Sequence, residues 1–344
     1  MEIKEVLREL SIQNGMAGQE GGAAEKIAEL LDGFGQISFT PLGSVICRVR
    51  EPQPGQPDLL LDAHMDEIGL IVTHIEDSGF LRVDSCGGVD RRVLPACQVT
   101  VHGRDGPVCG VIANTPPHLS SGEKKFPKPD ELYLDIGYTK DEAEKRVRPG
   151  DRVSLPAAFR GLLGDRVSGK ALDNRAGCAA ILHAARLLRE AELNCGLSLL
   201  FSSMEEIGGQ GAKTAAHAIS PTHAIVVDTS FALTPGSEKT ECGEMGKGPM
   251  IGISPILSSR MSDRLVKIAK DADIPYQFEV MSGQTSTNAD SIAATRAGVI
   301  TGLISIPIRY MHTPVETLSF ADLEAAGNLL AAFVKDFGKG GQTA

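Results

Sequence analysis

The sequence predicts an α/β fold, in which helices flank a mixed, mostly parallel sheet and a small β-barrel-like domain is inserted. Three observations support this prediction. Apolar residues at helical spacing fill about the first 33 positions, short β runs broken by Gly and Pro fill residues 67–163, and helices alternate with strands from Asn174 onward. We therefore predict an α/β domain of residues 1–66 and 164–344, with an inserted β domain of residues 67–163.

The α/β part begins with two amphipathic helices, because apolar residues recur at helical spacing in residues 3–10 and again in residues 24–31. Apolar strands are expected at residues 44–49 and 59–63. After the insert, we expect helices at residues 179–193, 212–219, 262–272, 289–296 and 321–334, and strands at residues 197–201, 224–227, 277–281 and 300–306. This alternation indicates βαβ units around a largely parallel sheet.

The insert has a different pattern. Strands are expected at residues 69–74, 80–83, 99–102, 108–112 and 152–155, and one short helix at residues 140–146. Several short strands separated by turns are typical of a small β-barrel or sandwich.

The composition excludes some functions. The 344 residues include 34 Lys plus Arg and 44 Asp plus Glu, a net charge of −10. This balance argues against nucleic acid or an anionic membrane as a partner, because both repel an acidic protein. Aromatic residues make up only 4% of the chain and Trp is absent, so platforms for stacking bases or sugars are scarce.

Two further features indicate a cytoplasmic protein. The seven cysteines are an odd number without a C-x-x-C pair, which fits neither a disulfide framework nor a zinc ribbon. The chain starts with charged residues, and no apolar stretch approaches the roughly 20 residues that a membrane helix needs.

Candidate ligands occur where apolar strands end. His64 and Asp66 follow the strand at residues 59–63 and share a face, so His64 could bind a metal while Asp66 orients its ring. The alternative is a structural His beside a solvated Asp. Asp173 precedes a long helix, where an N-cap is the alternative to a ligand.

Glu205 and Glu206 follow the strand at residues 197–201 and precede a glycine cluster. Neighbouring carboxylates point in different directions, so one can bind a metal while the other stays free as a base. Asp228 ends another strand, and His312 lies in the loop after residues 300–306. A single such residue is often structural, but the two His and three carboxylates together suit two divalent metals that share a bridging carboxylate; they are His64, Asp173, Glu206, Asp228 and His312.

Five segments in this order resemble the M42 family of metallo-aminopeptidases, which includes tetrahedral and glutamyl aminopeptidases and proteins labelled endoglucanase. They are DAHMDEIG, KALDNRAG, MEEIGGQGA, the strand that ends at Asp228, and RYMHTPVE. Within the insert, TPPH at residues 115–118 and ELYLDIG at residues 131–137 also resemble family segments. The resemblance therefore covers nearly the whole chain.

The resemblance implies that His64, Asp173 and Asp228 hold one metal ion and that Asp173 bridges to a second, held by Glu206 and His312. It also implies Glu205 as the general base and Asp66 as the residue that orients His64. Zn²⁺ or Co²⁺ would be bound, two ions per subunit, and the enzyme would remove N-terminal residues from peptides with a free N-terminus. The insert would serve dimerisation, in a homo-oligomer that could be a tetrahedral dodecamer.

Three positions depart from the family pattern: Asn174 and Asn288 stand where relatives often carry an acid, and Gln210 replaces a frequent Arg.

Three other functions remain as alternatives. A deacylase or carboxypeptidase could use a similar site but would need a cationic clamp for a free carboxylate. A glycosidase would need two carboxylates that flank a sugar bond. A non-catalytic shell-forming scaffold would bind metals for structural reasons only.

Overall fold

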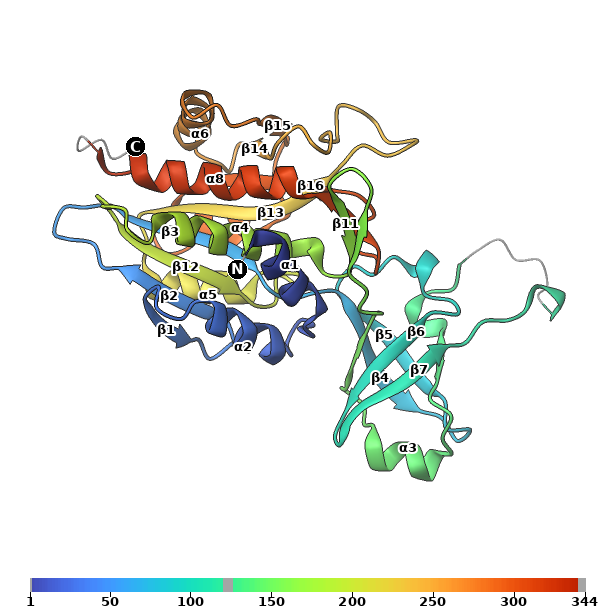
Figure 1. The fold of residues 1–344 in the computed structure, drawn as a ribbon. Coiled ribbons are helices and arrows are strands. Elements are labelled where there is room, and N and C mark those ends of the chain that lie inside the picture. The colour runs from blue at the N-terminus through green and yellow to red at the C-terminus, as the bar shows by residue number, and fades with distance from the viewer. Residues whose placement is uncertain (1, 120–125, 340–344) are drawn as a thin grey trace.

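The computed structural model describes residues 2–119 and 126–339. An eight-stranded sheet of order β1-β2-β12-β3-β13-β16-β14-β15 forms the centre of the main body (Figure 1). Its four middle strands run parallel: β12 (Gly196–Ser202), β3 (Asp58–His64), β13 (His223–Phe231) and β16 (Ile300–Ile308). On one side of these strands, β2 (Val45–Arg50) is antiparallel to β12, and β1 (Gln36–Phe39) is antiparallel to β2. On the other side, β14 (Met250–Ile253) is antiparallel to β16, and β15 (Gln277–Val280) is parallel to β14.

Helices cover both faces of this sheet. One face carries the largest apolar core, to which α1 (Ile3–Ile12), α2 (Gly21–Leu30), α4 (Leu172–Leu188), α6 (Ser259–Asp271) and α8 (Phe320–Asp336) contribute. The other face carries a second core beneath α5 (Gln210–Ile219) and α7 (Asn288–Ala293). Every residue of β3 is buried, because the strand is covered on both faces, and this explains its nearly unbroken apolar sequence. The predicted fold class is confirmed.

The segment between β3 and α4 contains a closed six-stranded barrel with an apolar core of its own. In chain order its strands are β4 (Gly69–Ile75), β5 (Leu81–Cys86), β6 (Gln98–Gly103), β7 (Gly106–Ile112), β8 (Tyr133–Asp135) and β9 (Arg152–Ser154). The short helix α3 (Lys140–Arg146) has the bounds expected from the sequence. Figure 1 shows the barrel projecting from one end of the main body. Of the two architectures that the pattern allowed, the chain forms the barrel.

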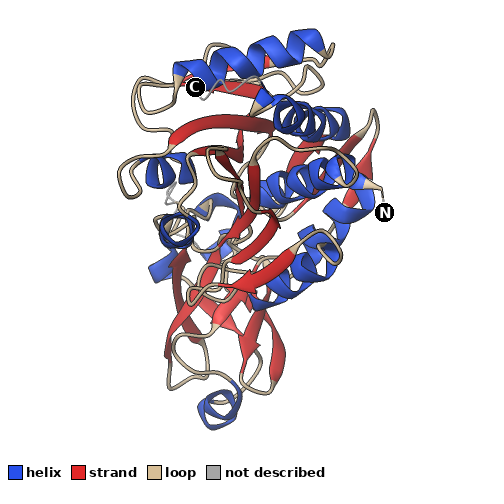
Figure 2. Cartoon of the chain, turned by 90° about the vertical axis from the view of Figure 1, so that its left-hand side faces the viewer, coloured by secondary structure: helices blue, strands red, loops and turns tan. Residues whose placement is uncertain are grey.

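Short elements complete the fold. A three-stranded sheet of β10 (Arg160–Leu162), β11 (Arg166–Gly169) and β17 (Glu316–Ser319) lies where the chain returns from the barrel. Within residues 2–119 and 126–339, single 3-10 turns occur at Arg91–Val93, Pro117–Leu119 and Pro129–Glu131. Figure 2, a view turned by 90°, shows the helices packed along the strands of the main body and the barrel strands below them. Among the described helices, none combines the length and the apolar character that crossing a bilayer requires.

Some elements differ from the sequence expectation. The helix expected at residues 179–193 begins seven residues earlier, at Leu172, and ends at Leu188. Six strands, β1, β8, β10, β11, β14 and β17, were not expected. They have only three or four residues each, and their pairing depends on neighbouring strands rather than on a local apolar pattern.

A buried ion pair joins the segments that enter and leave the barrel. The Lys170 ammonium, just before α4, donates to both carboxylate oxygens of Glu67 at 2.8 and 2.7 Å, and both side chains are 3% exposed. Lys170 also donates to the Gln13 carbonyl at 2.9 Å, and Glu67 accepts from the backbone N–H of Gly15. Three segments far apart in sequence therefore meet at one pair of charges.

We expect Lys170→Met to lower the free energy of unfolding by about 3–5 kcal/mol, because Glu67 would remain as a buried charge without its partner. Lys267→Met is the matched control: it removes an exposed ion pair with Asp271, 2.6 Å long, and should change the free energy of unfolding little, because water screens this pair. Urea unfolding followed by circular dichroism measures both. Equal losses in the two variants would contradict the role given to the buried pair, and Lys170→Met with Glu67→Met should recover part of the loss.

Candidate metal centre and its cavity

The candidate site lies at the carboxyl ends of the parallel strands, where α/β sheets bind their ligands. His64 is the last residue of β3, and Asp228 lies near the end of β13. Glu205 and Glu206 occupy the turn that follows β12, and His312 lies in the loop between β16 and β17. With Asp173, these residues border one cavity of about 870 Å³. All five predicted ligands and the predicted base are thus brought together.

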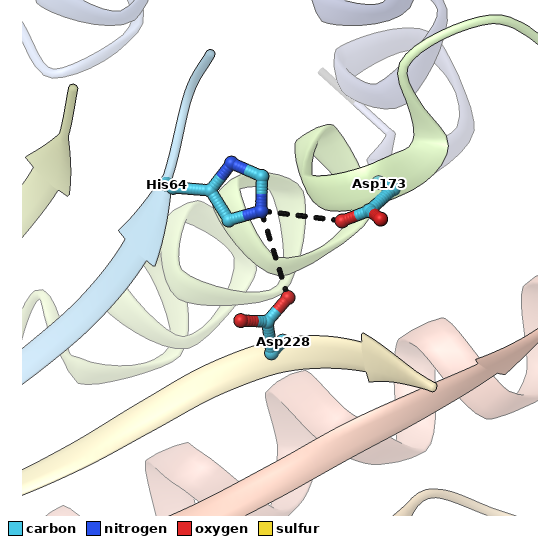
Figure 3. A group of neighbouring side chains, drawn as sticks. All are labelled: His64, Asp173 and Asp228. Carbon is cyan, nitrogen blue, oxygen red and sulfur yellow. Dashed lines mark hydrogen bonds and ion pairs between the residues drawn. The ribbon is translucent and has the colours of Figure 1, made fainter. Parts of the chain in front are cut away.

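Two groups of side chains can each hold a cation. In the first, Nε2 of His64 lies 3.2 Å from Oδ1 of Asp173 and 3.6 Å from Oδ1 of Asp228 (Figure 3). In the second, Nε2 of His312 lies 3.3 Å from Oδ2 of Asp173 and 3.5 Å from Oε2 of Glu206. Within each group, one ligand atom from every residue lies within 4.8 Å of the others.

Asp173 belongs to both groups through different oxygens, since Oδ1 faces His64 and Oδ2 faces His312. Figure 3 shows its carboxylate pointing from the start of α4 toward His64. The backbone at Asp173 is not helical, with φ −80° and ψ 105°, although the residue lies within the bounds of α4. Its side chain is therefore turned into the cavity, in contrast to the N-cap alternative.

The second ring nitrogen of each His is held by a backbone carbonyl. Nδ1 of His64 lies 3.2 Å from the Asp66 carbonyl, and Nδ1 of His312 lies 2.8 Å from the Gly88 carbonyl. Metal-binding imidazoles in proteins are commonly held in this way, because the second contact fixes the tautomer and the ring orientation. A side chain at position 88 would not fit, since its Cβ would lie 2.8 Å from Nδ1 of His312.

The pKa shifts of the candidate ligands and of Glu205 are consistent with cation binding at this site. Burial and the neighbouring Asp228 raise the pKa of Glu205 to about 8, and burial beside Asp173 raises the pKa of Glu206 well above its usual value. Burial opposes the charged form of His64, but the surrounding carboxylates outweigh it and raise its pKa. Oε1 of Glu206 is buried without a hydrogen-bond partner. Crowded carboxylates, an unpartnered oxygen and imidazole nitrogens are a donor set suited to divalent metal ions.

Asp66 has a larger structural role than the sequence suggested. Its side chain is fully buried and lies 3.4 Å from Nδ1 of His64, so it is not the solvated Asp of the alternative interpretation. Its two oxygens also accept the backbone N–H groups of Glu205 at 3.0 Å and Glu206 at 3.1 Å. One carboxylate therefore fixes the turn that carries both glutamates and contacts a ring of the first group.

Sequence reasoning missed two further buried acids that hold the site. Glu316 accepts the backbone N–H of Asp173 at 3.0 Å and that of His312 at 2.8 Å. Glu20 accepts the backbone N–H of Met204, next to Glu205, at 3.1 Å. Glu316 lies in the RYMHTPVE segment, four residues after His312, and this spacing was the one available signal. Nothing local marks Glu20, because its partner is distant in sequence.

The three departures from the family pattern have different surroundings. Asn174 is buried; it donates to the Val227 carbonyl at 2.8 Å and accepts the N–H of Gly177, which an Asp could not do in full because it has no donor. Asn288 is buried at the start of α7 and donates to Asp62 at 3.1 Å and to Ser202 at 2.8 Å. Gln210 is exposed at the start of α5.

The fold and the two groups of His and carboxylate side chains define an α/β protein with candidate sites for divalent cations at the carboxyl ends of its strands. A family model described as M42 glutamyl aminopeptidase matches residues 43–329, and the chain belongs to this family. The chain is 32% identical to the lysyl aminopeptidase of Pyrococcus furiosus, over 96% of each chain. The predicted family is thereby confirmed, and so is the enzyme class, an aminopeptidase that acts on peptides.

Solved structures of two peptidases are similar to this chain in fold and in sequence. Aminopeptidase APDkam598 from Desulfurococcus kamchatkensis superimposes with a TM-score of 0.91 at 36% identity, covering 97% of this chain and 94% of that one. The TET1 peptidase of Pyrococcus horikoshii, which can assemble into a tetrahedron or a large octahedral shell, gives a TM-score of 0.86 at 33% identity over 97% of this chain and 99% of its own.

We expect Asp66→Ala to loosen the turn that carries Glu205 and Glu206. Two buried N–H groups would lose their acceptor, at a cost of about 1–3 kcal/mol for each group left unsatisfied. Native-state hydrogen exchange should become faster at these two amides, while amides in the barrel strand β6 stay protected. Unchanged protection at Glu205 and Glu206 would contradict this role.

Proposed function

We propose that the chain is a dinuclear metal-dependent aminopeptidase that removes N-terminal residues from peptides by means of metal-activated water. The observation that carries the proposal is the double contact of Asp173, whose two oxygens face two separate ligand groups. His64, Asp173 and Asp228 would hold one ion, and Asp173, Glu206 and His312 the other. Zn²⁺ and Co²⁺ both suit nitrogen and oxygen ligands of this kind. When bound, such ions polarise a carbonyl and lower the pKa of a bound water toward 7.

Glu205 is the residue left to move the proton. It borders the same cavity but belongs to neither ligand group, so its carboxylate stays available. It accepts the proton of the attacking water and returns it to the leaving amine, acting first as general base and then as general acid. Asp66 keeps Glu205 in place through its backbone N–H and orients the ring of His64.

The charge of the cavity supports an aminopeptidase over a carboxypeptidase or deacylase. Among the described residues that line it, Lys239 is the one Lys or Arg, while the acidic ones are Asp173, Glu205, Glu206, Asp228, Glu241, Glu279 and Asp290. A free α-ammonium group is attracted to such a field, whereas a free carboxylate needs a cationic clamp. The enzyme therefore prefers substrates with a free N-terminus.

We place the protein in the cytoplasm as a homo-oligomer, in which the insert of residues 67–163 serves dimerisation and residues 1–66 and 164–344 form the catalytic domain. The closed barrel supports the first assignment because it stands apart from the sheet that carries the ligands (Figure 1). The shells formed by the TET1 peptidase of Pyrococcus horikoshii support an assembly larger than a dimer, up to a tetrahedral dodecamer.

We expect Glu205→Gln to retain its metal and to lose roughly 10²–10⁴-fold in kcat, because an amide cannot accept the proton. Glu206→Gln is the matched variant next to it and should weaken metal binding as well, since it removes a ligand. Steady-state kinetics and elemental analysis of both proteins separate the two roles. Full activity of Glu205→Gln would remove that residue from proton transfer.

Metal removal tests the reaction class. A panel of aminoacyl-p-nitroanilides, free and N-acetylated, is assayed before chelation, after chelation and after addition of Zn²⁺ or Co²⁺. We expect cleavage of free-amine substrates alone, its loss on chelation and its return with metal. Metal-independent cleavage of glucan oligomers would favour a glycosidase, and bound metal without any turnover would favour a non-catalytic scaffold.

A further inference from the structure

The cavity has a second polar group, away from the candidate metal ligands. Glu279 lies on β15, the last strand of the sheet, and its side chain is half-buried in the cavity wall. One carboxylate oxygen accepts from the Ser305 hydroxyl at 2.6 Å, and the other accepts from the Ser230 hydroxyl. These two serines come from β16 and β13, so the carboxylate is fixed by two strands other than its own.

The same two serines place Glu279 close to the first ligand group. Ser305 is the register partner of Asp228 across the β13–β16 pair, and Ser230 lies two residues after Asp228 on β13. Residues two apart on a strand share a face and are separated by about 6.5–7 Å. Glu279 therefore borders the part of the cavity next to Asp228.

Among the residues that the structure describes, no Lys, Arg or His pairs with Glu279. Its hydrogen-bond partners are neutral hydroxyls, and burial raises the pKa of its carboxyl, an effect to which Asp228 adds. Lys239 lines the same cavity, but its side chain is exposed. Two other acids away from the ligand groups line the cavity. Glu241 is exposed, and Asp290 is already engaged by the backbone N–H groups of Thr285 and Ser286 and by the Thr285 hydroxyl. Glu279 is therefore the enclosed carboxylate that remains available to a substrate.

The rest of this wall suits the stem of a long side chain. Phe231, Met250 and Met281 line the same cavity as Glu279. Phe278 and Val280 line it too, but they alternate with Glu279 along β15 and so lie on the opposite face of that strand. Lys and Arg side chains place their methylene groups against apolar surface while the charged end reaches a polar partner.

We propose that Glu279, held by Ser230 and Ser305, selects substrates whose first residue is lysine or arginine. This inference rests on the proposed aminopeptidase function and adds the class of side chain that the cavity accepts. A charge-assisted contact with a desolvated carboxylate favours a basic side chain over a neutral one of the same length, and an acidic side chain is repelled.

The test compares lysine and norleucine p-nitroanilides, which share a four-carbon stem and differ in the terminal ammonium. We expect kcat/KM of the wild-type enzyme to favour lysine by roughly 10- to 100-fold, the range typical of a hydrogen bond to a charged group. In Glu279→Gln the ratio should fall to near 1, because the amide keeps the shape and loses the charge. Glu238→Gln is the control: it removes one negative charge from an exposed position outside the cavity lining, and the ratio should persist.

Two results would overturn the inference while leaving the aminopeptidase intact. One is cleavage of both substrates with a ratio that Glu279→Gln does not change. The other is a preference for glutamyl p-nitroanilide that Lys239→Ala abolishes, which would assign the selection to Lys239. If no nitroanilide is cleaved, the proposed function fails, and calorimetric titration with lysinamide and norleucinamide decides separately: tighter lysinamide binding that is lost in Glu279→Gln supports the inference, and equal binding refutes it.

Discussion

The rest of the structure depends on the crowding of carboxylates at the carboxyl ends of the parallel strands. Asp66, Asp173, Glu205, Glu206 and Asp228 are at least half-buried within one small volume. Among the residues that the structure describes, the imidazoles of His64 and His312 are the groups that pair with them. Removing charges from water is costly unless they are paired or bind cations. This cluster therefore carries excess negative charge, which bound divalent cations would neutralise.

The acids around this centre divide into two kinds according to their partners. Asp66, Glu316 and Glu20 accept backbone N–H groups, and so they fix the segments that carry Asp173, His312 and the two glutamates. Asp173 and Glu206 instead direct their oxygens at imidazole nitrogens. Asp173 and Glu206 are thus free to bind a cation, and Asp66, Glu316 and Glu20 hold the segments around them. Asp228 does both, because it belongs to the first ligand group and also accepts the N–H of Thr229 at 2.8 Å.

The sequence predicted most of the fold, because the central strands are buried on both faces and appear as apolar runs. The five ligands were found for the same reason: each polar residue stands out where an apolar run ends. The short strands β8, β14 and β17 left no such pattern, since three or four residues define no period. Glu316, Glu20 and Glu279 were missed because each accepts a hydrogen bond from a segment distant in sequence, and a single acid in a short strand or before a helix resembles a surface residue.

Glu279, which we propose selects the substrate side chain, lies on a different strand of the sheet from the candidate metal ligands. β15 is attached to the sheet through β14, which pairs with β16 over two register positions, Met250 with Ser305 and Ile251 with Ile304. The strands β3 and β13, which carry His64 and Asp228, lie on the far side of β16 and are packed between helices on both faces. A residue change on β15 can therefore alter one wall of the cavity without moving the ligands on the other. Ser230 and Ser305 belong to the inner strands of the sheet. By hydrogen bonding to Glu279 they hold its carboxylate in a fixed position relative to the strands that carry the candidate ligands.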